Sequence, residues 1–155
     1  MEYDVQIKEL PAQLTLQVRK TVTMATIPSG VGEAFAAVMG QAEAGGHSYA
    51  GPPFITYPEE CVDAFPLVLC MPVAPGGAVP DPASGVVLQE VPGCTAACVV
   101  HVGPYDGVGA AYGALQGWMA ANGRTPAGAP REIYLNDPDS VAPEELLTEV
   151  AWPVA

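Results

Sequence analysis

Positive charge is scarce in this chain of 155 residues, which has 5 Lys and Arg residues against 17 Asp and Glu and a net charge of −12. No cluster of basic side chains is available to neutralise phosphates, and the acidic field repels a duplex. We therefore expect no direct binding of nucleic acid. An acidic surface also concentrates small cations near the protein, although solubility alone is a sufficient reason for such a charge.

Long apolar runs are missing as well, which excludes a membrane-spanning helix. The acidic start of the chain, residues 1–4, does not resemble a signal peptide. Half of the residues are hydrophobic and 14% are charged, a composition typical of a globular domain with its own core. We expect a single cytoplasmic domain over residues 1–155, without membrane contact.

Cysteine is present, but without a CxxC pair and without zinc-ligand spacing to His47 or His101. The four cysteines are Cys61, Cys70, Cys94 and Cys98. Cys94 and Cys98 fall on one face of a predicted strand, where their α-carbons are too far apart for a disulfide. We expect buried, reduced thiols, no metal site and no cofactor.

An internal repeat is the strongest pattern in the chain. Residues 128–138 are an imperfect copy of the segment that begins at residue 51, and residues 86–92 copy residues 5–11. Between the two copies the offset is 128 − 51 = 77 in the first case and 86 − 5 = 81 in the second. Self-similarity of this kind predicts two related halves, residues 1–73 and 85–155, joined by a connector at residues 74–84.

Each half is predicted to fold as strand, strand, helix, strand, strand. In the first half the strands are expected at 4–10, 13–24, 53–58 and 65–73, with a turn at Pro11, and the helix from an N-cap at Ser29 to Gly45. In the second half they are expected at 86–91, 95–102, 130–136 and 146–154, with the helix from an N-cap at Asp106 to Asn122. The fold class is therefore α+β: an eight-stranded, mostly antiparallel sheet with two helices on one face and a ligand cleft on the other.

The two copies differ in chemistry at one position, where Glu132 replaces Ile55. Because side chains alternate along a strand, Ile133 and Leu135 should point one way and Glu132 and Tyr134 the other. We expect the helices to cover the aliphatic side. Glu132 and Tyr134 would then face the concave side where the halves meet, and such junctions are common ligand sites.

Three phrases carry a resemblance to a known family: His-Val-Gly-Pro-Tyr at 101–105, Pro-Arg-Glu-Ile-Tyr at 130–134 with Asp-Pro at 137–138, and Glu-Val-Ala-Trp-Pro-Val at 149–154. In this order the chain resembles, over almost its whole length, the GyrI-like small-molecule-binding domain, also known as the AraC-type effector-binding domain. The resemblance implies a cup for bulky, flat, often cationic molecules, with a glutamate at the position of Glu132 at its base. Many members carry a DNA-binding helical module. These residues hold none, so we expect no transcriptional control by this chain alone.

A carboxylate in an apolar cup favours cationic ligands on physical grounds. Burial raises the pKa of such a carboxyl group unless a partner compensates for the lost water. A cation at ~4 Å, with an effective dielectric of ~20, supplies about 4 kcal/mol before desolvation. Aromatic faces add roughly 0.5–2 kcal/mol each through cation–π contacts. We therefore expect a standalone, multidrug-type binding protein with Glu132 as its charge anchor.

The candidate ligand-binding residues are this glutamate and the aromatic and Met side chains expected around it: Glu132, Tyr134, Tyr57, Trp152, Phe54, Tyr49, Trp118, Tyr105 and Met71. Phe35 and Tyr112 are expected to be helix packing, and Met39 and Met119 core residues. His101 is expected to be a structural histidine with satisfied hydrogen bonds.

Two alternatives remain open. In a hydrolase of cyclopropane-bearing or other electrophilic natural products, Glu132 would be the general base and Tyr134 would donate a hydrogen bond to the developing oxyanion. The resemblance also implies a regulator that docks on a protein such as gyrase. The default expectation is binding without turnover.

Overall fold

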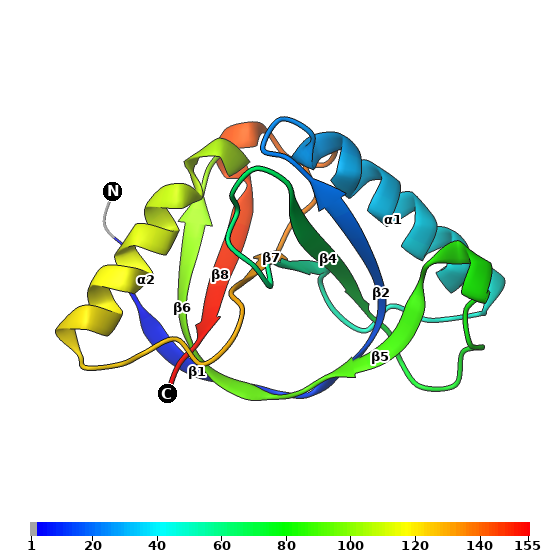
Figure 1. Cartoon of the computed structure of the whole chain (residues 1–155), viewed down its shortest axis with the longest axis horizontal. Coiled ribbons are helices and arrows are strands. Elements are labelled where there is room, and N and C mark those ends of the chain that lie inside the picture. The colour runs from blue at the N-terminus through cyan, green and yellow to red at the C-terminus, as the bar shows by residue number, and fades with distance from the viewer. Residues whose placement is uncertain (1–2) are drawn as a thin grey trace. The chain divides into compact units, whose positions relative to one another are not determined.

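The computed structural model describes residues 3–155. Met1 and Glu2, half of the acidic segment at the start of the chain, lie outside the described residues. Residues 3–155 form eight β-strands, two α-helices and three short 3₁₀-helices (Figure 1). The predicted α+β class, with its duplicated strand–strand–helix–strand–strand halves, is confirmed.

The chain divides into two compact units. Unit 1 comprises the residues up to Pro11 together with Gly93–Ala155. Its four antiparallel strands follow the order β1 (Gln6–Leu10), β6 (Cys94–Val102), β8 (Leu147–Pro153) and β7 (Arg131–Tyr134). Its helices are η2 (Tyr105–Gly107), α2 (Gly109–Ala121) and η3 (Pro143–Glu145).

Unit 2 comprises Ala12–Pro92 and has the same plan. Its strands follow the order β3 (Phe54–Thr56), β4 (Phe65–Pro72), β2 (Gln13–Val22) and β5 (Val87–Val91), all antiparallel to their neighbours. Its helices are α1 (Ile27–Ala44) and η1 (Pro82–Ser84). The repeat inferred from the sequence therefore corresponds to two sets of four strands with equivalent strand order, each with one α-helix, and the eight strands belong to one sheet as predicted.

The two repeats exchange their first strands. β1 pairs with β6, with Gln6 opposite Cys98, and β5 pairs with β2, with Val87 opposite Gln17. These pairs are equivalent, since 87 − 6 and 98 − 17 both equal 81. Consequently β1 and β2, which flank Pro11, belong to different units.

Helix α1 begins earlier than the sequence predicted. Its first residue is Ile27, and Thr26 precedes it at the N-cap. Ser29, the predicted cap, lies inside the first turn, where its hydroxyl donates to the Thr26 carbonyl oxygen at 3.0 Å. Pro28 accounts for the earlier start, because its fixed φ suits the first turn and its missing N–H costs nothing there.

Helix α2 begins later than predicted. Asp106 lies in η2 and not at an N-cap, because residues 105–107 form a 3₁₀ turn that ends before the α-helix starts. Both helix C-termini agree with the prediction: α1 stops before Gly45 and α2 before Asn122.

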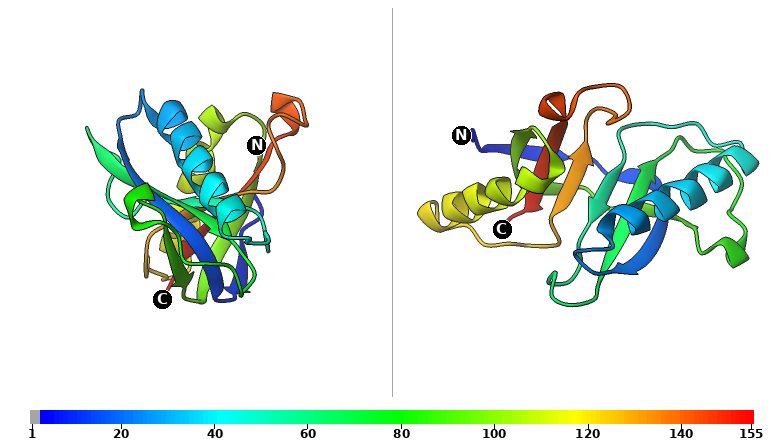
Figure 2. Two further views of the ribbon diagram at one scale, coloured as in Figure 1. Left: turned by 90° about the vertical axis from the view of Figure 1, so that its right-hand side faces the viewer. Right: turned by 90° about the horizontal axis from the view of Figure 1, so that it is seen from above.

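Helix α2 covers one face of the unit 1 sheet, as Figures 1 and 2 show. The core on this face consists of Ala97, Val99, Val108, Ala111, Leu115, Met119, Val150 and Val154. A smaller hydrophobic cluster on the opposite face consists of buried Ala96, Cys98 and Ala151, with Leu10, Cys94 and Ile133 packed against them. Consecutive residues of β6 and β8 thus supply opposite faces, as strand geometry requires.

Helix α1 lies against the unit 2 sheet in the same way (Figure 2). Its buried residues are Gly30, Ala34, Val38 and Ala42. A Cβ at Gly30 would collide with Val22 Cγ1, so only glycine allows this approach of helix and strand.

Met39 is 49% exposed, and its predicted place in the core is wrong, because it lies on the solvent side of α1. Met119 is buried as predicted.

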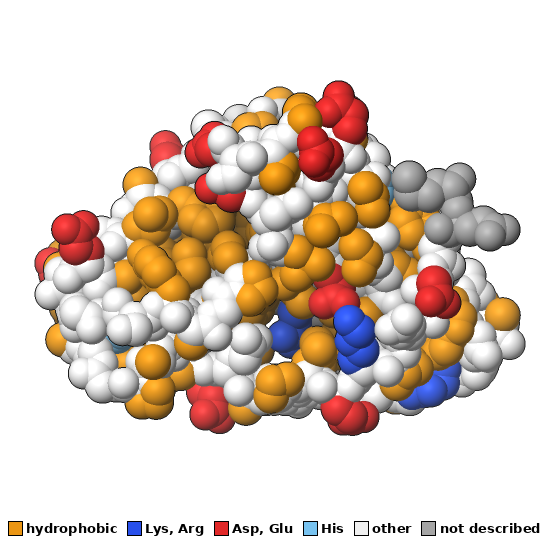
Figure 3. Space-filling model, turned by 180° about the vertical axis from the view of Figure 1, so that it is seen from behind, with side chains coloured by type: hydrophobic (Ala, Val, Ile, Leu, Met, Phe, Trp, Pro, Cys, Tyr) orange, Lys and Arg blue, Asp and Glu red, His pale blue; other side chains and the backbone are white. Residues whose placement is uncertain are grey.

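Basic side chains do not gather into a patch. Among the described residues, Lys8, Arg19 and Lys20 each form an ion pair with a glutamate. In Figure 3 the Lys and Arg side chains are few, and Asp or Glu side chains are seen near them. No helix within residues 3–155 combines the length and apolarity needed to cross a bilayer.

Candidate functional site

Glu132 lies on β7 of unit 1, half-buried, and both of its carboxylate oxygens accept hydrogen bonds from tyrosines. Tyr112 on α2 donates to Oε2 at 2.8 Å, and Tyr134 on the same strand donates to Oε1 at 3.1 Å. The carboxylate is therefore held in a defined orientation by one helix residue and one strand residue.

Burial raises the pKa of Glu132 above its usual value. The hydrogen bonds from Tyr112 and Tyr134 act in the opposite direction, because they stabilise the ionised form, but they do not cancel the loss of water. A positive charge placed beside Glu132 would supply the compensation that is missing.

Glu132 lies on the face of the unit 1 sheet that carries α2. It is opposite Val150, which belongs to the core beneath α2, and it accepts a hydrogen bond from that helix. Ile133 packs on the other face with Cys98 and Ala151. The prediction that the helix covers the aliphatic face of β7 is therefore wrong. Small residues of β6 and β8 fill the face next to Ile133, and the helix face accommodates the polar side chain.

Four aromatic side chains accompany this carboxylate in unit 1. Tyr105 meets Tyr134 edge to face, with ring centroids 5.6 Å apart and an interplanar angle of 81°. Tyr112 meets Trp152 in the same way, at 5.9 Å and 76°. We call these five residues the Glu132 cluster. Edge-to-face pairs of this kind are favourable and hold the ring orientations.

Tyr105 forms the exposed end of the Glu132 cluster, with 40% of its surface accessible. Burial, and then the nearby Asp137, raise the pKa of Tyr105, so its hydroxyl stays neutral at physiological pH. Trp152 is half-buried, and its indole N–H has no acceptor within residues 3–155.

Arg131 does not compete for the Glu132 carboxylate. It is buried, and its guanidinium donates to the Cys94 sulfur at 3.8 Å, among the residues of the opposite face. Arg131 therefore points away from Glu132, as the alternation of side chains along β7 requires.

Trp118, another predicted site residue, is half-buried and packs against the core beneath α2.

The remaining predicted site residues belong to unit 2. Phe54 and Met71 are buried there, at 1% and 7% exposure. Tyr57 is half-buried and packs on Phe65, with centroids 6.3 Å apart, whereas Tyr49 is 54% exposed and forms a β-bridge with Val73.

Tyr112 is the cluster residue that sequence reasoning assigned to helix packing. Its ring does pack against the core, but its hydroxyl binds Glu132. A signal was present, because Tyr112 replaces Phe35 of the first copy at the same offset, 112 − 35 = 77, that relates Glu132 to Ile55. The second copy thus carries both a hydroxyl and a carboxylate that the first copy lacks.

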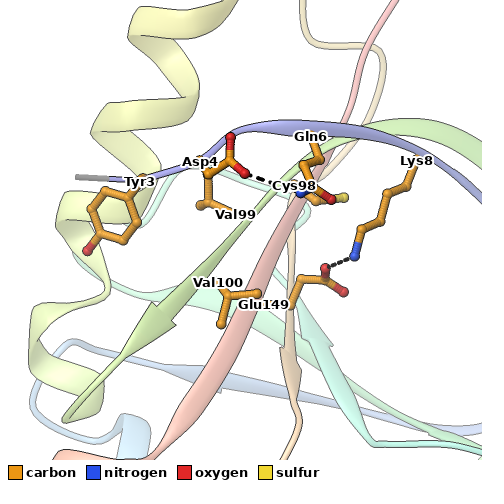
Figure 4. Close-up of a pocket in the computed structure, with 8 residues that line it drawn as sticks. All are labelled: Tyr3, Asp4, Gln6, Lys8, Cys98, Val99, Val100 and Glu149. Carbon is orange, nitrogen blue, oxygen red and sulfur yellow. Dashed lines mark hydrogen bonds and ion pairs between the residues drawn. The ribbon is translucent and has the colours of Figure 1, made fainter. Parts of the chain in front are cut away.

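A separate hollow in unit 1 lies beside β1 (Figure 4). Lys8 forms an ion pair with Glu149 across it at 2.6 Å, and this hydrogen bond raises the pKa of Lys8. Burial, reinforced by Glu149, raises the pKa of the adjacent Cys98 thiol to about 11. Lys8 and Glu149 neutralise each other, Asp4 accepts from the Gln6 amide at 3.2 Å, and the thiol stays protonated, so Cys98 offers the hollow no nucleophile.

The four cysteines are all reduced thiols, as predicted. Cys70 and Cys98 are buried and Cys94 is half-buried. Cys61 is exposed, which corrects the expectation that every thiol is buried, because it lies in the loop between β3 and β4.

Comparison with known proteins agrees with this architecture. The model of the GyrI-like small molecule binding domain matches residues 3–155. The crystal structure of the EcmrR C-terminal domain is similar to this chain, with a TM-score of 0.90 and 25% identity, covering 100% of this chain and 99% of that one. EcmrR in its complex with DNA gives a TM-score of 0.84 at 25% identity, covering 98% of this chain, which spans only 57% of that one.

A hydrolase from Listeria innocua shares the fold, with a TM-score of 0.72, 18% identity and coverage of 97% of this chain and 91% of that one. No curated protein matches significantly. With its domain model matched from residue 3 to residue 155, the chain belongs to the GyrI-like small-molecule-binding domain family.

Proposed function

We propose that this domain binds bulky, flat or cationic hydrophobic molecules, with Glu132 as the charge anchor. The observation that supports this most is the carboxylate held by two tyrosines, each packed edge to face on a further aromatic ring, while burial raises its pKa. A cation at this position restores the ionised form, and the rings add cation–π attraction of roughly 0.5–2 kcal/mol each. Charge and flatness, more than a set of directional hydrogen bonds, select the ligand.

Fluorescence polarisation of rhodamine 6G, a flat cationic dye, tests the proposal. The wild-type protein should bind the dye with a micromolar dissociation constant. Glu132→Gln keeps the shape but removes the charge, and one of the two tyrosines must then accept from the amide N–H instead of donating. It should weaken binding by about 10-fold or more, since attraction at ~4 Å is worth a few kcal/mol.

Glu43→Gln is the matched control, because it makes the same substitution at an exposed position of α1 in unit 2. It should change the affinity by less than about twofold, as expected for a screened surface charge. Equal losses in both variants would assign the effect to net charge and remove Glu132 from the binding mechanism.

Hydrolysis of an electrophilic ring is the second candidate, and the two tyrosine hydroxyls beside one carboxylate favour it. Glu132 would activate water, and Tyr134 would stabilise the oxygen on which negative charge develops. Mass spectrometry of a cyclopropane-bearing alkylating compound after incubation separates the two functions. A gain of one water that Glu132→Gln abolishes indicates turnover, and recovery of the intact compound indicates binding.

A further inference from the structure

His101 on β6 is buried, at 5% exposure, and both of its ring nitrogens have partners. Nε2 lies 3.0 Å from the Pro104 carbonyl oxygen, and Nδ1 lies 2.9 Å from the Tyr3 hydroxyl. A carbonyl oxygen can only accept, so Nε2 carries a hydrogen and donates it to Pro104, while Nδ1 shares a hydrogen bond with the Tyr3 hydroxyl. This confirms His101 as a satisfied histidine.

The bond to Pro104 holds the segment that carries Tyr105. Pro104 immediately precedes Tyr105, and Gly107 packs so closely on the imidazole that an added Cβ would lie 3.0 Å from it. At the preceding bend, Gly103 has a φ of +125°, which a residue with a side chain rarely adopts. Residues 103–107 therefore form a short strap seated on His101.

The strap reaches from His101 to the Glu132 cluster. His101 and Tyr134 are both opposite Thr148 in their ladders with β8, so the three residues form one row across β6, β8 and β7. His101 and Tyr134 stand at the two ends of that row, about 10 Å apart at the usual strand spacing. The strap is bonded to His101 at one end, and its Tyr105 packs on Tyr134 at the other.

We propose that His101 is a positioning residue for the ligand site. Through its bond to Pro104 it fixes Tyr105 against Tyr134, one of the two tyrosines that donate to Glu132. This inference rests on the proposed function for its effect on ligands. Its structural part concerns the unliganded protein and is tested separately.

The first experiment uses no ligand. In protein with ¹³C-labelled tyrosine rings, the edge-to-face contact should displace the ring resonances of Tyr105 and Tyr134 from their random-coil positions. His101→Ala should move both sets towards random coil. His101→Gln should keep most of the displacement, because the glutamine amide can donate to the Pro104 carbonyl. Unchanged resonances in His101→Ala would overturn the inference, whatever the protein binds.

The second experiment is a double-mutant cycle with tetraphenylphosphonium, measured by calorimetry. His101→Ala and Tyr105→Ala should each weaken binding by about 2- to 30-fold, the range for one cation–π contact. The double variant should bind no more weakly than Tyr105→Ala alone, because His101 acts through Tyr105. Additive losses would overturn the inference while leaving the proposed function intact. If the wild-type protein does not bind tetraphenylphosphonium, the proposed function is contradicted, and so is the effect of His101 on ligands.

His47 supplies the matched control. It is the second of the two histidines and also bonds a carbonyl oxygen, that of Ala78, at 2.7 Å, but in unit 2. His47→Ala should leave the Tyr105 and Tyr134 resonances and the tetraphenylphosphonium affinity unchanged. Similar losses in the two histidine variants would indicate a general effect on stability and contradict a specific role for His101.

Discussion

Tyr112 and Glu132 are joined by a hydrogen bond of 2.8 Å in which the helix α2 tyrosine donates to the carboxylate on β7. The bond ties the charged group of a short strand to the helix that forms the core of unit 1. Because the donor belongs to a packed ring, the carboxylate orientation is determined by the core and not by a mobile loop.

Loss of the Tyr112 hydroxyl should raise the pKa of Glu132 further. Tyr112→Phe keeps the ring and its contact with Trp152 but removes a donor that stabilises the ionised carboxylate. Carboxyl ¹³C titration measures the shift. Tyr105→Phe, which removes a hydroxyl from the same cluster, is the control and should leave the Glu132 titration in place. No difference between the two variants would contradict the assigned role of Tyr112.

Glu132 should make the unliganded protein less stable as the pH rises. Its folded pKa is raised, so the folded state holds the proton more tightly than the unfolded state. That contribution is fully present below the unfolded pKa of about 4.3 and is lost as the pH rises through the folded pKa. Relative to wild type, Glu132→Gln should therefore be more stable at about pH 7, and the difference should shrink as the pH falls towards about 4. Urea denaturation at several pH values checks this. A Gln variant that is less stable at neutral pH would contradict it.

The equivalent position in unit 2 should not tolerate a carboxylate. Ile55 is 1% exposed, opposite Leu69, and its surroundings are apolar. Ile55→Glu should destabilise the protein by about 3–5 kcal/mol, the range for an unpartnered buried charge. Ile55→Val, the control, should cost about 0.5–1.5 kcal/mol. Comparable unfolding midpoints for the two variants would show that unit 2 has a site of its own.

Thiol reactivity should distinguish Cys61 from the buried cysteines. Cys61 is exposed, whereas Cys98 is buried with its pKa raised to about 11. Ellman's reagent at pH 8 should label Cys61 rapidly, and Cys70 and Cys98 only after the protein unfolds. Cys61→Ser should abolish the fast phase. A fast phase of the same size in that variant would mean that another thiol is accessible.

The repeat and the alternation of side chains predicted most of the elements to within a few residues. They could not predict the exchange of β1 and β5 between the units. Two similar repeats offer the same local pattern to either partner strand, so pairing within a repeat and pairing between repeats satisfy the same sequence.

Alternation also separates two faces of a strand without saying which one faces a helix. Alternation therefore predicts correctly that Glu132 and Tyr134 share a face of β7. It does not predict that this face is the one that carries α2. The predicted first residues of both helices were wrong for a local reason. Ser29 and Asp106 are residue types that often cap helices, but Pro28 and the turn at residues 105–107 move the helix boundaries.

The central claim, that the Glu132 carboxylate attracts a cation, is tested most directly by the pH dependence of tetraphenylphosphonium affinity. This cation keeps its charge at every pH, so any change must come from the protein. Wild-type affinity should fall as acid protonates Glu132, and the affinity of Glu132→Gln should be weak and nearly independent of pH over the same range. The same pH dependence in both proteins would contradict the claim.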